Sequence, residues 1–220
     1  MNTASTAATK TSQPRLRADA QRNRERIVAA AREIMVEHGA EVPLDEVARR
    51  AGVGNATLYR HFPDRADLLR HVMLSVLDRT ADRAERALAA EGDDAFQALR
   101  AFVHAAVEER IGALCPLLSD GVDKDHPDLL AARDRLERAV ESLMGAARES
   151  GRLRADIAVG DLMVAITQLT RPLPGNRCTD FDRFVHRHLQ LFLDGLMAPA
   201  RSELPGSAAT LDDLRQQCRR

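Results

Sequence analysis

Basic, amide and hydroxyl side chains gather in the first third of this 220-residue chain. Residues 10–32 hold seven Lys and Arg against two Asp and Glu, although the whole chain has a formal net charge of −1. Farther along, residues 55–61 read NATLYRH and place an amide, hydroxyls, a guanidinium and an imidazole close together. Such groups donate hydrogen bonds to phosphate oxygens and to base edges. This local excess of positive charge indicates a contact with a polyanion at one place on the protein, and not non-specific binding over its whole surface.

An enzyme or a metal-binding protein is the competing interpretation of this sequence. His186 and His188 lie two positions apart, so on a helix they point to different sides and make a poor metal pair. Cys115, Cys178 and Cys218 are odd in number and show no CxxC spacing, which argues against a disulfide framework and a structural zinc site. The sequence contains no GxSxG, P-loop, GxGxxG or HExxH pattern. We therefore expect no enzyme, no catalytic or metal-binding residues and no cofactor.

Helical periodicity dominates the chain after residue 20, and no strand-type alternation of apolar and polar residues is sustained anywhere. This pattern predicts an all-α fold. The expected helices cover 22–39, 44–51, 55–61, a long stretch that starts at Asp64, 94–111, 112–119, 127–150, 160–171 and 180–197. No apolar run approaches the ~18 residues of a membrane helix, and the N-terminus lacks the apolar region of a signal peptide. Together with the cysteine usage, these features predict a cytoplasmic protein.

The segment 43–62, PLDEVARRAGVGNATLYRHF, has the layout of a helix-turn-helix. Two short helices are joined by Gly52-Val53-Gly54, and Gly52 can take the positive φ that a tight turn requires. Leu58 and Phe62 are assigned to the core between the helices. Spacing alone leaves two interpretations open, which are DNA binding and a short helical hairpin that binds no nucleic acid.

The run AGVGNATLYRHFPDRADLL, with RERIVAAAREIMVEHG before it, resembles the DNA-binding domain of TetR-family transcriptional regulators over about residues 22–70. The agreeing positions are the AGV turn, Thr57-Leu58-Tyr59, His61-Phe62, Arg65 and Leu68-Leu69. The family often has Thr at position 43, Ser at 54 and Gly at 56, where this chain has Pro43, Gly54 and Ala56, and these departures bear on base preference. The resemblance implies an N-terminal three-helix helix-turn-helix DNA-binding domain, followed by a C-terminal helical domain for ligand binding and dimerisation.

The resemblance and the side-chain chemistry together assign roles in DNA binding. Helix 55–61 is expected to enter the major groove, where Asn55 suits adenine, Ala56 a thymine methyl, and Arg60 guanine or a phosphate. The resemblance implies that Thr57, Tyr59 and His61 grip phosphates. The complete set of expected DNA-binding residues is Arg22, Arg24, Asn55, Ala56, Thr57, Tyr59, Arg60, His61 and Arg65.

Four regions follow from these assignments: a flexible basic arm (1–20), the helix-turn-helix domain (21–70), an effector-binding and dimerisation domain (71–198) and a flexible tail (199–220). The arm contains Lys10, Arg15 and Arg17. It either lies in a minor groove next to the recognition helix or is a solvated tail.

Palindromic half-sites call for a two-fold dimer. The last expected helix carries an apolar stripe at helical spacing, and the helix before it offers a matching stripe. Two helices from each protomer would form a four-helix bundle, as the resemblance also implies; the alternative is that both stripes pack only within the monomer. The expected interface residues are Leu162, Ile166, Phe181, Phe184, Val185, His188 and Phe192.

The helices between these regions are expected to enclose an effector site. Its candidate lining residues are Met73, Phe96, Phe102, Cys115, Met144 and Met163. Stripes of Met and aromatic residues are more often plain core, and no polar cluster indicates a ligand class. We expect a homodimeric repressor that a small molecule of unknown identity releases from a palindromic double-stranded DNA operator. The alternative is a DNA-binding regulator without such an effector, controlled by a protein partner or by its abundance.

Overall fold

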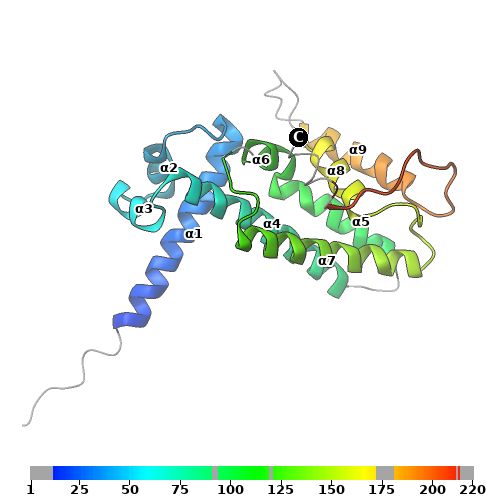
Figure 1. Ribbon diagram of the computed structural model, residues 1–220, viewed down its shortest axis with the longest axis horizontal. Coiled ribbons are helices and arrows are strands. Elements are labelled where there is room, and N and C mark those ends of the chain that lie inside the picture. The colour runs from blue at the N-terminus through cyan, green and yellow to red at the C-terminus, as the bar shows by residue number, and fades with distance from the viewer. Residues whose placement is uncertain (1–11, 91–93, 119–120, 172–180, 212, 214–220) are drawn as a thin grey trace, which may run out of the picture. The chain divides into compact units, whose positions relative to one another are not determined.

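The computed structural model describes residues 12–90, 94–118, 121–171, 181–211 and 213, and within them every regular element is a helix (Figure 1). In this part of the chain the one β-type pairing is an isolated bridge between Leu153 and Met197. The all-α fold is therefore confirmed. The elements are α1 (Ser12–His38), α2 (Leu44–Ala51), α3 (Asn55–His61), α4 (Arg65–Ala89), α5 (Ala95–Ala106), the 3₁₀ turn η1 (Val107–Glu109), α6 (Ile111–Leu118), α7 (Pro127–Glu149), α8 (Val159–Leu169) and α9 (Phe181–Gly195).

The first helix is longer than the sequence pattern predicted. It begins at Ser12 and not near residue 22, so the expectation of a flexible arm is wrong for residues 12–20, while residues 1–11, with Lys10, lie outside the described part. Residues 12–21 have no apolar face, and a search for apolar spacing therefore finds no helix there. Their Ala, Arg and Gln residues are nevertheless good helix formers.

The chain divides into two compact units, of which the first ends at Val72 and the second starts at Met73. The sequence had placed this boundary two residues earlier, after residue 70. It falls within α4, so that helix contributes residues to both units. None of the described helices combines the length and the apolar character that crossing a membrane requires.

In the first unit, α1, α2 and α3 pack around a small apolar core. Ile27, Ile34 and Met35 of α1 have no exposed area, and neither has Phe62 at the end of α3. Leu58 is 1% exposed, so its assignment and that of Phe62 to the core are confirmed. Each such side chain contributes about 1.5–3 kcal/mol through its removal from water. The core therefore fixes which face of the seven-residue helix α3 points inward.

In the second unit, α5 packs against α7 and α9, and α6 packs against α8. The inner faces of α5 and α7 supply Phe96, Phe102, Leu129 and Leu143, none of which has exposed area. Asp94 begins α5 as its N-cap, because its carboxylate accepts hydrogen bonds from the backbone N–H groups of Phe96 and Gln97 at 3.1 and 3.2 Å. The second unit thus has a core of its own.

Residues 209 and 210 lie against the start of α8, so the expectation of a flexible tail is wrong for this part of the chain. The backbone N–H of Ala209 donates to Asp161 at 3.2 Å, and the same carboxylate accepts from Ala158 at 2.9 Å and so caps α8. Gly160 gives the returning chain room, since a Cβ there would lie 2.7 Å from the carbonyl oxygen of Thr210. Residue 212 and residues 214–220 lie outside the described part. No periodic apolar pattern marks this contact, so the sequence alone does not reveal it.

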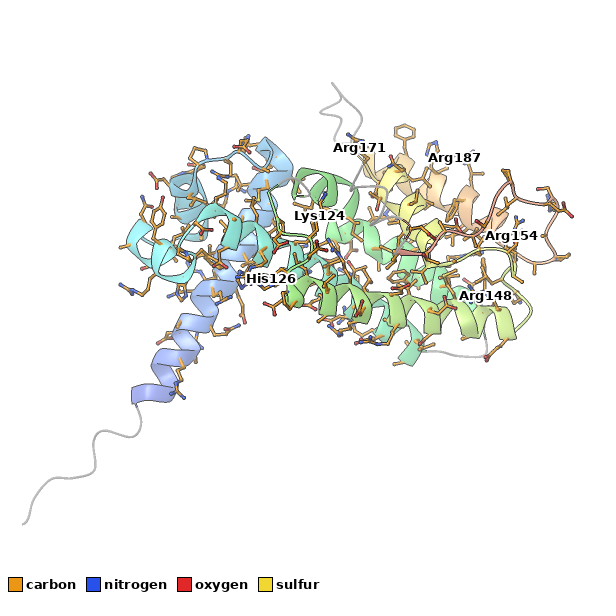
Figure 2. The ribbon with its side chains drawn as sticks, viewed as in Figure 1. Lys124, His126, Arg148, Arg154, Arg171 and Arg187 are labelled. Atoms are coloured by element: carbon orange, nitrogen blue, oxygen red, sulfur yellow. The ribbon has the colours of Figure 1, made fainter. Side chains whose placement is uncertain are left out.

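The end of α9 is held by Arg154, which is only 6% exposed (Figure 2). Its guanidinium forms two hydrogen bonds with Asp156, at 2.6 and 2.8 Å, and donates to the carbonyl oxygens of Ser202 at 2.8 Å and Gly195 at 3.3 Å. The backbone N–H of Arg154 also donates to Leu196 at 3.0 Å. One buried cation thereby joins the loop before α8 to the chain on both sides of residue 199.

Candidate nucleic-acid interface

Helix α3 presents polar side chains to solvent on the face opposite Leu58. Asn55, Ala56, Tyr59 and Arg60 are exposed, and Tyr59 keeps 49% of its area accessible. None of these side chains is engaged in a hydrogen bond or ion pair with the rest of the described chain. The face therefore offers an amide, a phenol and a guanidinium that are free to bind another molecule.

The turn before α3 has the geometry that its glycines predict. Gly52 has a φ of +65°, in the left-handed region that favours glycine. Its N–H donates to Arg49 at 3.1 Å, and the N–H of Val53 donates to Ala48 at 3.0 Å, which is the pair of bonds of a Schellman ending. Helix α2 therefore stops at a defined point and α3 begins three residues later, at Asn55.

Arg26 of α1 also holds this turn, and the sequence analysis missed it. Its Nη2 atom donates to the carbonyl oxygens of Ala51 at 2.6 Å and Gly52 at 3.3 Å. A Cβ at Gly52 would lie only 2.8 Å from that nitrogen. The contact spans 25 residues of sequence, so no local pattern could have indicated it. A cation at the C-terminal end of α2 also complements the partial negative charge of the helix dipole.

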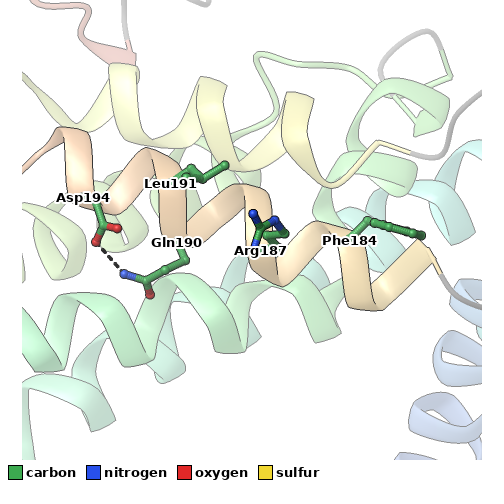
Figure 3. Close-up of a pocket in the computed structure, with 5 residues that line it drawn as sticks. All are labelled: Phe184, Arg187, Gln190, Leu191 and Asp194. Carbon is green, nitrogen blue, oxygen red and sulfur yellow. Dashed lines mark hydrogen bonds between the residues drawn. The ribbon is translucent and has the colours of Figure 1, made fainter.

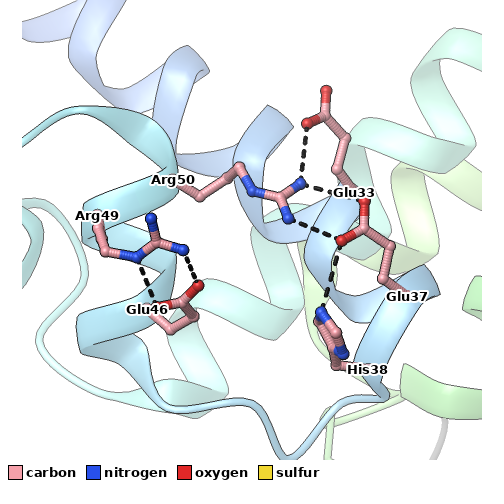
Figure 4. Close-up of polar contacts among 6 residues, drawn as sticks. All are labelled: Glu33, Glu37, His38, Glu46, Arg49 and Arg50. Carbon is pink, nitrogen blue, oxygen red and sulfur yellow. Dashed lines mark hydrogen bonds and ion pairs between the residues drawn. The ribbon is translucent and has the colours of Figure 1, made fainter.

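Ion pairs hold α2 against α1 (Figure 4). Arg50 of α2 pairs with Glu37 at 2.7 Å and with Glu33 at 3.6 Å, both on α1. The hydrogen bond from Arg50 keeps the pKa of Glu37 below its ordinary value. Arg49 pairs with Glu46 on its own helix. Both arginines of α2 are thus engaged within the unit, in contrast to Arg60 on α3.

Three other predicted DNA-binding arginines have partners inside the first unit. Arg65 donates to the carbonyl oxygens of Ala40 and Val42, each at 2.6 Å, and so ties the loop before α2 to the start of α4. The Arg24 guanidinium lies 5.4 Å from the ring centroid of Phe62 and contacts His71. Arg22 pairs with Asp19 on α1. Arg24 and Arg65 therefore support the fold in a way that sequence reasoning did not foresee, and their DNA contacts stay a prediction.

Thr57 and His61, the remaining predicted phosphate ligands, lie on the sides of α3. Both are partly exposed, and the His61 ring lies 6.4 Å from that of Phe62. The structure thus brings Asn55, Ala56 and Tyr59 together with Arg60 on one outward face, with Thr57 and His61 beside it. Their contacts with DNA stay predictions.

The residues predicted to line an effector site belong to the apolar core of the second unit. Phe96, Phe102 and Met144 have no exposed area, and Met73 and Met163 are 5% and 8% exposed. The side chain of Cys115 lies outside the described part of the chain. These five described residues line the interior of the second unit, and their contact with a ligand stays a prediction.

The residues predicted to form the dimer interface divide into two groups, one buried inside the protomer and one exposed on its surface. Leu162, Ile166 and Val185 are 1%, 0% and 2% exposed within the single protomer, so they build its core and not its surface, which corrects the expectation for them. Phe184 is 54% exposed, His188 is exposed and Phe192 is partly exposed. The side chain of Phe181 lies outside the described part.

The outward face of α9 also includes residues that the sequence analysis missed. Leu191 is 59% exposed, and Val164 on α8 is 39% exposed. A surface hollow along α9 is lined by Phe184, Arg187, Gln190, Leu191 and Asp194 (Figure 3). Among the described residues, no three His, Cys, Asp or Glu side chains are grouped so that they would hold a metal ion.

Two family descriptions match the chain. Residues 27–72 match "Bacterial regulatory proteins, tetR family", and residues 92–198 match "Transcriptional regulator SbtR-like, C-terminal domain". The first match covers the C-terminal part of α1, all of α2 and α3, and the start of α4, and the second covers the stretch from α5 to α9. Both units of the structure thus have counterparts among transcriptional regulators.

Individual proteins agree with these matches. An HTH-type transcriptional regulator of Staphylococcus aureus is 41% identical over 64 residues, which is 29% of this chain and 35% of that protein; the match therefore spans about a third of the relative. The crystal structure of a TetR transcription regulatory protein from Mycobacterium vanbaalenii shares 32% identity, with a TM-score of 0.62 over 83% of this chain and 99% of that one. LfrR from Mycobacterium smegmatis, solved in complex with proflavine, is 22% identical with a TM-score of 0.57 over 84% of this chain and 99% of that one, and shows likeness of fold.

Proposed function

The chain belongs to the TetR family and is a DNA-binding transcriptional regulator, and from this premise we propose that it is a homodimeric repressor that a small molecule releases from its operator. The proposal covers three steps: insertion of α3 into the major groove, pairing of two copies, and loss of DNA affinity on binding of the effector. Each step has its own support in the structure.

The observation that carries the proposal is the outward face of α3. Its hydrogen-bonding side chains are exposed and unengaged within the described chain, whereas the arginines of α2 are held in ion pairs. A helix in the major groove needs such a face, with an amide or a guanidinium aimed at base edges and hydroxyls at the flanking phosphates. Asn55 and Arg60 are the proposed base readers, and Tyr59 contacts the backbone.

Pairing of two copies is supported by the exposed apolar side chains of α8 and α9. Val164, Phe184 and Leu191 are three of the five large hydrophobic residues that the described surface exposes, and Tyr59 of α3 is a fourth. Phe184 and Leu191 line the same hollow on α9, and apolar groups that are exposed side by side mark surfaces that bind another molecule. A two-fold dimer would present its two α3 helices to half-sites about 34 Å apart, one turn of B-DNA.

Release by an effector would act through the second unit. Its core residues Phe96, Phe102 and Met144 are the proposed lining, and LfrR, whose fold is similar, has been solved with proflavine. Helix α4 belongs to both units, so a ligand that displaces its second half also acts on the first. The ligand changes DNA affinity only if it binds the two states with different affinity.

Selection of duplexes from a randomised library by the full-length chain tests the proposal. We expect enrichment of palindromes with half-sites about one helical turn apart. Asn55→Ala should lose the base preference at one position of the enriched half-site, whereas the matched variant Asn23→Ala, on α1, should keep the preference at every position. Enrichment of no sequence, or of single half-sites only, would contradict the proposal. A screen for compounds that weaken binding to the selected duplex then tests the effector step, and failure of every compound class would favour control by a protein partner.

A further inference from the structure

A pair of histidines joins α5 to α9 at the surface of the second unit. The Nδ1 atoms of His104 on α5 and His186 on α9 lie 2.9 Å apart, and their ring centroids lie 5.1 Å apart. His104 is partly exposed and His186 is exposed, so solvent reaches the pair. The two residues are 82 positions apart in the sequence, and the local spacing of His186 and His188 therefore gave no sign of this pairing.

The two nitrogens are separated by about the distance between neighbouring ligands of one metal ion. Bonds from a transition metal to an imidazole nitrogen are about 2.0–2.1 Å long. Two such bonds at a right angle place their nitrogens about 2.9 Å apart, and a tetrahedral angle places them about 3.4 Å apart. The observed 2.9 Å therefore fits the first geometry directly. The rings need only turn until both nitrogen lone pairs meet at the ion.

His104 already has the tautomer that coordination through Nδ1 requires. Gln190 donates through its amide nitrogen to Asp194 at 2.6 Å (Figure 3), which leaves its oxygen as the acceptor in its hydrogen bond with His104. Because Nδ1 of His104 faces His186, Nε2 is the nitrogen left to donate to Gln190, and Nδ1 carries the lone pair. Outer partners of this kind orient the histidines that bind metals.

The positions of the two histidines are fixed by the core on which their helices lie. Leu189 and Leu193 of α9 have no exposed area, and neither have Phe102 and Val103 of α5. Helix α5 also packs directly against α9. Ligand groups that the fold already holds at the binding distance need little further ordering, which favours binding.

Arg100 opposes a cation at this place, but its head group is directed away from the pair. It lies one turn before His104 on α5, and its guanidinium is 5.9 Å from the ring centroid of Phe96, in the preceding turn. Its positive charge still acts on His104. A soft or borderline ion bound by imidazole is therefore favoured over Mg²⁺ or Ca²⁺, which prefer oxygen ligands.

We propose that His104 and His186 bind one divalent ion of the nickel, copper and zinc class through their Nδ1 atoms, with water in the remaining coordination positions. The site lies within one protomer and goes beyond the proposed function, since it depends neither on the dimer nor on the effector. The bound ion joins α5 to α9 and therefore stabilises the folded second unit by mass action.

Titration of the untagged full-length chain with NiCl₂ and with CuCl₂ tests the site. Calorimetry should give one ion per protomer, and electron paramagnetic resonance of bound Cu²⁺ should show coupling to two imidazole nitrogens. His104→Gln and His186→Gln should each lose this ion. His188→Gln is the matched control and should keep it, because the Nδ1 of His188 contacts the carbonyl oxygen of Phe184 on its own helix. MgCl₂ should not bind.

Two neighbouring residues sharpen the test. Gln190→Ala should weaken metal binding by about 10-fold, because it removes the outer partner that orients His104. Arg100→Gln should strengthen it, because a nearby positive charge is removed. If Arg100→Gln weakened binding instead, an anion would be part of the site and the proposal would be wrong.

The remaining outcomes are equally distinct. A chain that binds neither ion, or one whose binding survives the loss of His104 or of His186, overturns the site. Copper coupled to fewer than two imidazole nitrogens also overturns it. Circular dichroism confirms that each variant remains folded. None of these results depends on DNA binding, so the proposed function stands or falls separately.

Discussion

The guanidinium of Arg26 donates a 2.6 Å hydrogen bond to the carbonyl oxygen of Ala51, so the first helix of the DNA-binding unit holds the turn that aims the recognition helix. A second bond, of 3.3 Å, reaches Gly52. Both carbonyls stand at the C-terminal end of α2, where backbone acceptors have no partner within the helix. The orientation of α3 therefore depends on a residue that need not touch DNA.

Replacement of Arg26 by Gln should loosen this turn. We expect a loss of about 1 kcal/mol in the free energy of unfolding, since a charged hydrogen bond is removed at a partly exposed site. The amide of Val53, which donates to Ala48 in the same turn, should exchange faster with solvent hydrogen. Urea denaturation and hydrogen exchange measure the two effects. Arg17→Gln removes the same charge from an exposed position of α1 and should leave the free energy of unfolding and the exchange rate unchanged. Equal behaviour of the two variants would show that the hydrogen bonds of Arg26 do not stabilise the turn.

Gly52→Ala should destabilise the same turn through the backbone. An alanine at a φ of +65° costs about 1–2 kcal/mol, and its Cβ would collide with the Arg26 side chain. Gly145→Ala is the matched control, because Gly145 is inside α7 with open space around it and should gain about 0.5–1 kcal/mol. The two midpoints of urea denaturation should therefore move in opposite directions. A shift of both in one direction would contradict the assigned role of Gly52.

Asn55→Ala should relax base preference at one position of the half-site. The expected loss of discrimination is about 1–3 kcal/mol at that base pair, with little change at the others. Titration of the variant against operators that carry each single-base substitution gives the profile. Tyr59→Phe, which removes a proposed phosphate contact, should instead weaken binding to all the operators by the same factor. Identical profiles for the two variants would mean that the division into base readers and phosphate ligands is wrong.

The contact between α5 and α9 should weaken in acid. The Nδ1 atoms of His104 and His186 lie 2.9 Å apart, so at least one ring must be neutral. Burial lowers the pKa of His104 below its ordinary value of 6.5; a hydrogen bond with Gln190 opposes this shift, and the positive charges of His186 and Arg100 reinforce it. Because the unfolded chain binds the proton more readily, this stability is present above pH 6.5 and is lost as the pH falls through the folded pKa.

Thermal unfolding between about pH 7 and pH 5 measures this loss. His104→Gln should flatten the pH dependence in that range. His188→Gln should not, since His188 is exposed and its Nδ1 already contacts the carbonyl oxygen of Phe184 at 2.7 Å on its own helix. A variant at position 104 that remains as acid-sensitive as the unmodified chain would exclude the histidine pair as the cause.

Elements with a strong local signal could be predicted from the sequence. Apolar spacing placed α2 and α3 correctly, and Gly52 indicated the turn between them. The assignments of Leu58 and Phe62 to the core were also confirmed. They could be made because burial of one face of a helix makes apolar residues recur at helical spacing in the sequence.

Features made by distant residues could not be predicted in this way. The contacts of Arg26 with Ala51 and of Arg65 with Ala40 each join residues 25 positions apart. The wide apolar stripe of α9 gave no means of separating Val185, which faces the protomer core, from Phe184, which faces outward. Helix periodicity shows that a face is apolar but not what covers it.

The chain that returns over α8 sets a practical limit on where the second unit can be cut. The family match ends at residue 198, yet Ser202 accepts a hydrogen bond from the buried Arg154, and Ala209 lies on Gly160. A fragment that stops at 198 would leave that guanidinium short of an acceptor and open the start of α8 to water. An expression fragment of this unit therefore needs to extend at least through residue 211.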